Sequence, residues 1–295
     1  MGYLPLSMKS ASPSFAFFGT PAVARDTLAA LIEGGYLPSV VVTSPDARRG
    51  RGMKKQPSET RAYAEDYGMP VLASEVLDNQ FLKDLELFGC HYAIVVAYGR
   101  ILPQPVLDLF PGGLLNVHYS LLPRYRGAAP VERALLAGES ETGVSIQKMV
   151  LKMDAGDVLA QEHTPIEATE TIGELRHRLI KMGADLLIAS LPAFLDNGIS
   201  ATPQEELKIT FAPKIEKSEG QLSLHDSPEQ NWRTYRALIE SLGVYFYAHK
   251  EGKRIRVKVK KAHREGDAFV IDRIVPEGKS ERPFLWLADA GWEPE

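Results

Sequence analysis

Apolar runs alternate with amphipathic stretches along the first two thirds of the chain. Four of these runs are almost wholly apolar: residues 15–19, 38–45, 91–99 and 113–120. Such continuous hydrophobicity is typical of strands buried on both faces. Three stretches repeat apolar residues at helical spacing: residues 21–34, 78–88 and 171–196. Strands that alternate with helices predict an α/β fold with a Rossmann-like parallel or mixed sheet.

The pattern changes after Pro203, which indicates a second and smaller domain. We expect a catalytic domain at 14–205, a β-rich domain at 206–295 and a disordered N-terminus at 1–13. The second domain has one helical pattern, at 229–242. Its segment 253–261, KRIRVKVKK, alternates cations with β-branched residues and is typical of a strand with one charged face.

Composition narrows the class of protein without identifying it. The 295 residues are 44% hydrophobic and 24% charged, with a net charge of −4, which is ordinary for a globular protein. The single cysteine, Cys90, excludes an internal disulfide and a Cys-based zinc site. The N-terminus lacks the features of a signal peptide, and no apolar stretch is long enough to span a bilayer. We therefore expect a cytoplasmic protein.

Two polar residues interrupt the apolar run at 113–120. Asn116 and His118 are two positions apart, so both point to the face of the strand that Leu114 also occupies. An amide and an imidazole that converge on one point can stabilise a developing oxyanion, and the imidazole can move a proton. The alternative is that both are core residues with backbone hydrogen bonds.

Asp154 is the best candidate for a third group. It follows the strand-like run GVSIQKMV in the segment MDAGD, where an Asp-x-Gly turn is the simpler interpretation. Spacing alone does not bring it to His118. No Gly-x-Ser-x-Gly elbow or metal-ligand spacing accompanies the histidine, so these residues favour acyl or one-carbon transfer through a tetrahedral intermediate, without a metal.

Four segments together resemble the formyltransferase fold family: FGTP at 18–21, VVAYGRILP at 95–103, NVHYSLLPRYRGAAP at 116–130 and ETGVSIQKMVLKMDAGDVL at 141–159. The resemblance covers nearly all of residues 14–200. Within this family, the segments most resemble the members that formylate initiator methionyl-tRNA, which is a step of translation initiation. It implies that Asn116, His118 and Asp154 are catalytic, with 10-formyltetrahydrofolate as the formyl donor.

The resemblance also implies where this co-substrate binds. Its pterin would lie against the backbone of Tyr98, Gly99, Arg100, Ile101 and Leu102 and against the Asp154 loop. The wall behind the histidine would come from Ser120, Leu121, Leu122 and Pro123. FGTP lacks the second and third glycines of a dinucleotide fingerprint, so Gly19 is better explained by a tight turn into the helix.

The acceptor amine is predicted from two basic segments. The loop 44–58 contains the cations Arg48, Arg49, Arg51, Lys54 and Lys55 against one acid, and resembles the insertion that enters the tRNA acceptor stem. The strand at 253–261 would present Arg254, Arg256, Lys258 and Lys260 to RNA phosphates. A solvated loop and a lysine-protected edge strand are the alternatives.

Other functions of the same fold stay open. A nucleotide-amino-sugar formyltransferase would share the catalytic residues, and a non-catalytic RNA- or folate-binding protein would not need them. The family's second domain is usually a longer OB-like β-barrel, and here it is shortened. We expect a monomer that binds tRNA and folate and no membrane.

Overall fold

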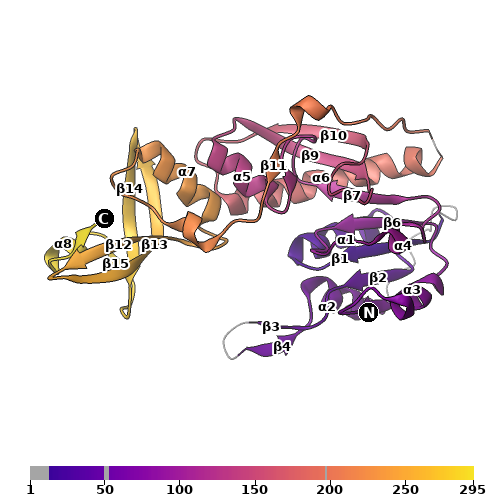
Figure 1. Ribbon diagram of the computed structural model, residues 1–295, viewed down its shortest axis with the longest axis horizontal. Coiled ribbons are helices and arrows are strands. Elements are labelled where there is room, and N and C mark those ends of the chain that lie inside the picture. The colour runs from indigo at the N-terminus through magenta and orange to yellow at the C-terminus, as the bar shows by residue number, and fades with distance from the viewer. Residues whose placement is uncertain (1–12, 50–52, 197) are drawn as a thin grey trace. The chain divides into compact units, whose positions relative to one another are not determined.

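The computed structural model describes residues 13–49, 53–196 and 198–295 (Figure 1). The chain divides into two compact units, each built from separated segments. The first unit comprises the described parts of Met1–Arg126, Gly143–His163 and Arg178–Thr210. The second comprises Gly127–Thr142, Thr164–His177 and Phe211–Glu295. The two units are interleaved along the sequence, so no single residue divides them. The domain boundary expected near residue 205 stays a prediction.

A mixed sheet forms the centre of the first unit. In the described part of the chain it has seven strands, in the order β10-β9-β7-β6-β1-β2-β5. Their bounds are β1 (Phe15–Gly19), β2 (Val40–Thr43), β5 (Val71–Ala73), β6 (Tyr92–Val96), β7 (Leu114–His118), β9 (Glu141–Lys148) and β10 (Val158–Pro165). The pairs β1–β2, β1–β6, β2–β5 and β6–β7 are parallel, and β7–β9 is antiparallel. The Rossmann-like mixed sheet is confirmed.

Helices cover both faces of this sheet. They are α1 (Ala22–Glu33), α2 (Glu59–Asp66), α3 (Asn79–Glu86), α4 (Gln104–Leu107) and α6 (Ile172–Leu195). Gly183 of α6 lies against Val117 of β7 and Val144 of β9. A Cβ at position 183 would lie 3.0 Å from Val117 and 3.3 Å from Val144, so glycine lets α6 pack closely on that face without displacing these valines. Residues of β7 that alternate with Val117 therefore point away from α6.

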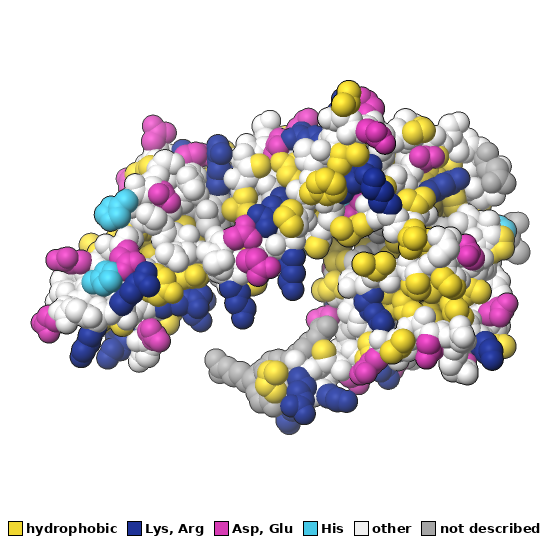
Figure 2. Space-filling view, in the orientation of Figure 1, with side chains coloured by type: hydrophobic (Ala, Val, Ile, Leu, Met, Phe, Trp, Pro, Cys, Tyr) yellow, Lys and Arg dark blue, Asp and Glu magenta, His cyan; other side chains and the backbone are white. Residues whose placement is uncertain are grey.

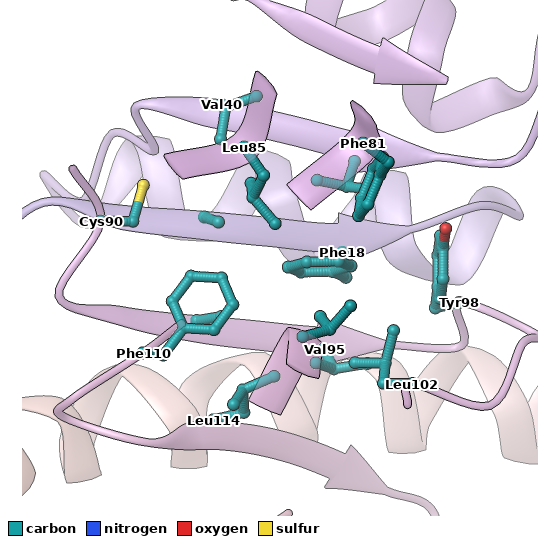
Figure 3. Close-up of a cluster of buried hydrophobic side chains, with 14 residues drawn as sticks. Phe18, Val40, Phe81, Leu85, Cys90, Val95, Tyr98, Leu102, Phe110 and Leu114 are labelled. Atoms are coloured by element: carbon teal, nitrogen blue, oxygen red, sulfur yellow. The ribbon is translucent and has the colours of Figure 1, made fainter. Parts of the chain in front are cut away.

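The opposite face carries the core drawn in Figure 3. Phe18, Val95 and Leu114 of three neighbouring strands pack with Phe81 of α3 and with Phe110. Burying each large side chain contributes roughly 1.5–3 kcal/mol. Leu114 is the first residue of β7 on this face, and Asn116 and His118 continue it. The apolar core thus leads directly to the two polar positions.

The second unit contains an antiparallel sheet in the order β15-β14-β13-β12-β16. Its strands are β12 (Val244–Lys250), β13 (Lys253–Glu265), β14 (Ala268–Pro276), β15 (Arg282–Pro283) and β16 (Glu293–Pro294). Its helices are α5 (Pro130–Ala137), α7 (Pro228–Leu238) and α8 (Trp286–Asp289). Trp232 and Tyr235 of α7 are buried, as are Phe246, Val257 and Ile274 of the sheet.

A small β domain after the α/β domain is confirmed. Within the described residues no pairing joins the outer strands β15 and β16, so the sheet is open. Closing a barrel needs a minimum set of strands with matched tilt and stagger, and two of these strands are only two residues long.

Minor elements complete the chain. They are β3 (Ala47–Arg49), β4 (Lys54–Gln56), β8 (Arg126–Gly127), β11 (Phe211–Ala212) and the 3₁₀ turns η1 (Glu206–Lys208) and η2 (Lys217–Gly220). The loop expected at 44–58 was wrong in part, because β3 and β4 pair as antiparallel strands. The helix expected at 229–242 ends earlier, at Leu238. Across the described ranges no helix is long and apolar enough to cross a membrane.

Candidate active site

Asn116 and His118 lie at the carboxyl-terminal end of β7, on one face of the sheet. The His118 side chain is buried, and Asn116 is half-buried. In the antiparallel pairing with β9, Asn116 is opposite Gln147 and His118 is opposite Ser145. Opposed residues share a face, so four polar side chains gather on the side of the sheet that faces away from α6. Among the described residues, the Asn116 amide has no hydrogen-bond partner.

One hydrogen bond, at Nε2, orients the His118 ring. Its Nε2 lies 2.9 Å from the carbonyl oxygen of Tyr125. A carbonyl oxygen can only accept, so Nε2 must carry the proton and donate it. In the neutral ring Nδ1 then has the lone pair. This nitrogen lies 3.7 Å from Oδ1 of Asp154, which is too long for a hydrogen bond but close enough for strong charge attraction once the ring is protonated.

Asp154 reaches His118 because its loop folds back over the sheet. Its backbone has φ +50°, a left-handed conformation that aspartate tolerates better than most residues. Gly156 follows, and a Cβ there would lie 1.6 Å from the carbonyl oxygen of Lys148. The loop can approach β9 this closely only with glycine at 156. The Asp-x-Gly segment therefore forms a turn and also places the Asp154 carboxylate near His118. The structure brings Asn116, His118 and Asp154 together.

Gln147 belongs to the same cluster and was not singled out in the sequence. Its Nε2 donates to Oδ1 of Asp154 at 2.9 Å. Its Oε1 is buried and has no partner among the described residues. A buried acceptor without a protein partner costs about 1–3 kcal/mol unless water or a ligand supplies the hydrogen bond. Polar Ser145 and Gln147 alternate in the run GVSIQKMV, and this was the available signal.

Gln204 is a second residue near this cluster that was not predicted from the sequence. Its Nε2 donates to the carbonyl oxygens of Asp154 and Gly156 at 2.9 and 2.6 Å. Its Oε1 accepts from Nε and Nη2 of Arg126 at 3.0 and 2.8 Å. A single glutamine in an irregular segment has no periodicity, so no sequence pattern could have identified it.

The five residues expected to contact the pterin differ in exposure and in what they bind. Tyr98 and Leu102 are part of the apolar core, so only their backbone and the edges of their side chains can meet a ligand. Ile101 is 78% exposed, and Gly99 has φ +78° with open space around it. The Arg100 guanidinium donates to the carbonyl oxygens of Ser74 and Glu75, both at 2.6 Å. Arg100 thus ties its loop to the segment after β5.

The segment after β7 is held by internal hydrogen bonds. The Ser120 hydroxyl donates to the carbonyl oxygen of Arg124, and the Leu122 amide donates to Oγ of Ser145. Leu122 is buried, and Leu121 is half-buried. Leu122 and Pro123 line a hollow of about 260 Å³ that Gln204 also borders. That these residues form the wall behind His118 stays a prediction.

Exposed apolar side chains precede Asp154 in its loop. Val150, Leu151 and Met153 are 45–60% exposed, although each is large and apolar. A flat ring system on an apolar linker, such as a folate, needs apolar contacts beside a few polar groups. Together with Ile101 and the unpartnered Oε1 of Gln147, these side chains fit such a molecule. In the described part of the chain no three His, Cys, Asp or Glu residues are grouped as metal ligands would be.

The predicted tRNA contacts belong to both units. In the first unit Arg48, Lys54 and Lys55 are exposed on the β3–β4 hairpin. Arg49 is in β3, and Arg51 lies outside the described residues. Figure 2 shows Lys and Arg side chains on this hairpin of the first unit and on the sheet of the second unit.

On β13 the cations are not equivalent. Arg254 forms a two-point ion pair with Glu295 and stacks on the Tyr247 ring, 3.6 Å from its centroid. Arg256 stacks on Tyr245 at 3.7 Å. Lys258 and Lys260 are exposed, and Val257 and Val259 on the other face are buried. The predicted alternation is confirmed, but one of its four cations is already neutralised by a carboxylate.

Several known proteins have sequences similar to that of this chain. The family described as Formyl transferase matches residues 14–191. A methionyl-tRNA formyltransferase of Parvibaculum lavamentivorans is 38% identical, over 90% of this chain and 86% of that protein. One from Thermus thermophilus is 40% identical, over 89% of this chain and 85% of that protein.

Solved structures share the fold at lower identity. An N-formyltransferase from Helicobacter canadensis, in complex with folinic acid and dTDP-3-aminofucose, has a TM-score of 0.64 at 17% identity, over 92% of this chain and all of that one. A phosphoribosylglycinamide formyltransferase from Bacillus halodurans has a TM-score of 0.53 at 22% identity, over 62% of this chain and 95% of that one. The family match and the similar sequences decide the assignment: the chain belongs to the formyl transferase family and, within it, to the methionyl-tRNA formyltransferases.

Proposed function

We propose that this chain transfers the formyl group of 10-formyltetrahydrofolate to the amino group of initiator methionyl-tRNA, with Asn116, His118 and Asp154 as its catalytic residues. The observation that carries the proposal is the approach of an amide, an imidazole and a carboxylate on one face of the sheet, in a chain whose similar sequences are named for this reaction. No protein nucleophile is needed, because the acceptor brings its own amine.

The residues divide the chemistry as follows. As the amine nitrogen bonds to the formyl carbon, negative charge develops on the formyl oxygen, and the Asn116 amide is available to donate to it. The amine must lose a proton, and Nδ1 of His118 can take it because Nε2 is committed to Tyr125. Asp154 stabilises the resulting imidazolium. His118 can then give the proton to the nitrogen from which the formyl carbon departs, which balances the reaction.

The acceptor is inferred from the relatives and from the charged surfaces. Exposed Arg48, Lys54 and Lys55 on one unit and Lys258 and Lys260 on the other suit the phosphates of a polyanion. A nucleotide amino sugar would use neither surface. Because one cysteine suits a reducing compartment, we also infer a cytoplasmic protein, and the monomeric state stays a prediction.

The test is formyl transfer from 10-formyltetrahydrofolate to initiator methionyl-tRNA, with a nucleotide amino sugar as a parallel acceptor. The Asn116→Ala variant should lose about 10²–10³-fold in kcat, because one oxyanion donor is removed. Asn79→Ala, at an exposed asparagine of α3, is the matched control and should keep full activity. Transfer to the sugar alone would overturn the acceptor, and an unaffected Asn116→Ala variant would overturn the site.

A further inference from the structure

The segment that follows α6 returns to the edge of the sheet of the first unit. Thr202 and Val158 exchange two backbone hydrogen bonds, at 2.9 and 2.8 Å, so residue 202 extends the edge at β10. Gln204 comes two residues later. The backbone pairing therefore determines where the Gln204 side chain can reach, and it reaches the loop that carries Asp154.

The Gln204 carboxamide uses both of its ends there. Its NH₂ group donates to two carbonyl oxygens of the loop, those of Asp154 and Gly156, and its oxygen accepts two N–H groups of Arg126. Four hydrogen bonds of 2.6–3.0 Å leave the amide one orientation, because exchanging its O and N would set an oxygen against two carbonyl oxygens.

Arg126 connects this amide to the histidine. It is 4% exposed, and it directly follows Tyr125, whose carbonyl oxygen accepts from Nε2 of His118. The Arg126 backbone amide is itself bonded to the carbonyl oxygen of Thr210. One side of the 3.7 Å gap between His118 and Asp154 is thus held through Tyr125 and Arg126, and the other through Gln204.

We propose that Arg126 and Gln204 form a clamp that sets the separation of His118 and Asp154, with Gln204 as a positioning residue for formyl transfer. The proposal rests on the proposed function. Asp154 has a left-handed backbone, which a residue other than glycine keeps only where its surroundings hold it. The two hydrogen bonds from Gln204 hold the backbone on both sides of Ala155 and so maintain that conformation.

Two substitutions at Gln204 separate positioning from folding. Gln204→Glu keeps an acceptor for the buried Arg126 but sets an oxygen against the two carbonyl oxygens, so it should still fold and should lose less thermal stability than Gln204→Ala, which leaves Arg126 without this acceptor. Because misplacing a reacting group by about 1 Å costs on the order of 10²-fold, both Gln204→Glu and Gln204→Ala should lose roughly 10–100-fold in kcat with KM for tRNA unchanged. Glu205→Ala is the matched control, since Glu205 pairs with Lys208 at the surface and should leave kcat unaltered.

A double-mutant cycle tests whether Gln204 acts through Asp154. In an Asp154→Asn background, Gln204→Ala should have no further effect on kcat, because the carboxylate that it positions is gone. Losses that multiply instead would overturn the proposal, and so would full activity in Gln204→Glu.

Exchange of backbone amide hydrogens tests the clamp without measuring formyl transfer. In Gln204→Glu the amides of residues 154–157 should exchange at least tenfold faster than in the parent, and those of β7 should be unchanged. If the parent chain fails to formylate methionyl-tRNA, the proposed function fails, while faster exchange in that loop still supports the clamp. Unchanged exchange overturns the clamp whatever the activity.

Discussion

The His118→Gln variant separates two functions of this side chain: the hydrogen bond that Nε2 donates and the proton that Nδ1 accepts. The Nε2 of a glutamine is about as far from the backbone as Nε2 of histidine, so the amide in His118→Gln can still donate to the carbonyl oxygen of Tyr125. That hydrogen bond is 2.9 Å long and lies next to a buried ring. Keeping it avoids the penalty of about 1–3 kcal/mol for stranding a buried polar group, so His118→Gln should unfold near the temperature of the parent.

The same variant has no group that can take a proton at the position of Nδ1. Loss of a proton-transfer residue typically lowers the rate about 10²–10⁴-fold, which corresponds to roughly 2.7–5.4 kcal/mol of activation free energy. His118→Ala should show the same loss of rate and, in addition, reduced stability. The contrast between the two variants isolates the contribution of Nδ1.

The assay is single-turnover formyl transfer with saturating tRNA, beside thermal unfolding of each variant. Single-turnover conditions remove product release from the measured rate. Retention of more than about a tenth of the parent rate by His118→Gln would refute the assignment of Nδ1 as the proton acceptor, because general base catalysis is worth more than that. A large drop in its unfolding temperature would refute the assignment of Nε2 to Tyr125.

Two further predictions concern charge. Lys258→Ala should flatten the dependence of tRNA affinity on salt by about 0.7–0.9 in log–log slope, whereas Arg254→Ala, at a cation already paired with Glu295, should change it little; equal slopes would contradict this ranking. The Arg133 guanidinium holds the pKa of Glu219 below its usual range through a hydrogen-bonded ion pair. A depressed pKa adds stability above the unfolded pKa near 4.3 that is lost as pH falls through the folded pKa. Glu219→Gln should therefore lower the free energy of unfolding by roughly 1 kcal/mol at pH 7, and by progressively less as the pH falls through the folded pKa of Glu219.

Sequence reasoning succeeded where one physical pattern dominates. Strands such as β1 and β6 are buried on both faces, and their continuous hydrophobicity therefore identifies them. The positions of Asn116 and His118 on one face followed from strand alternation alone. The β3–β4 hairpin was missed because its strands, ARR and KKQ, have no apolar face.

The contact between Asp154 and His118, which are far apart in the sequence, could not be predicted from the residues alone. Asp154 meets His118 because its loop folds back over β9, and that path depends on Gly156 and on the amide of Gln204. Neither residue differs in the sequence from an ordinary turn glycine or surface glutamine. Only the resemblance to a family linked Asp154 to the reaction, and it did not extend to Gln147 or Gln204.

The interleaved composition of the two units has a consequence for synthesis on the ribosome. The second unit draws on Gly127–Thr142 and Thr164–His177 as well as on Phe211–Glu295. Because chains emerge from the N-terminus, α5 and the first part of α6 leave the exit tunnel long before the strands of their own unit exist. The β1–β2–β6–β7 sheet can form early, while the residues that α5 buries, Val131, Ala134 and Leu135, stay exposed at least until α7, which packs against α5, has been made. A nascent chain stalled near residue 200 should therefore be bound by chaperones at α5, and release of the full chain should end that binding.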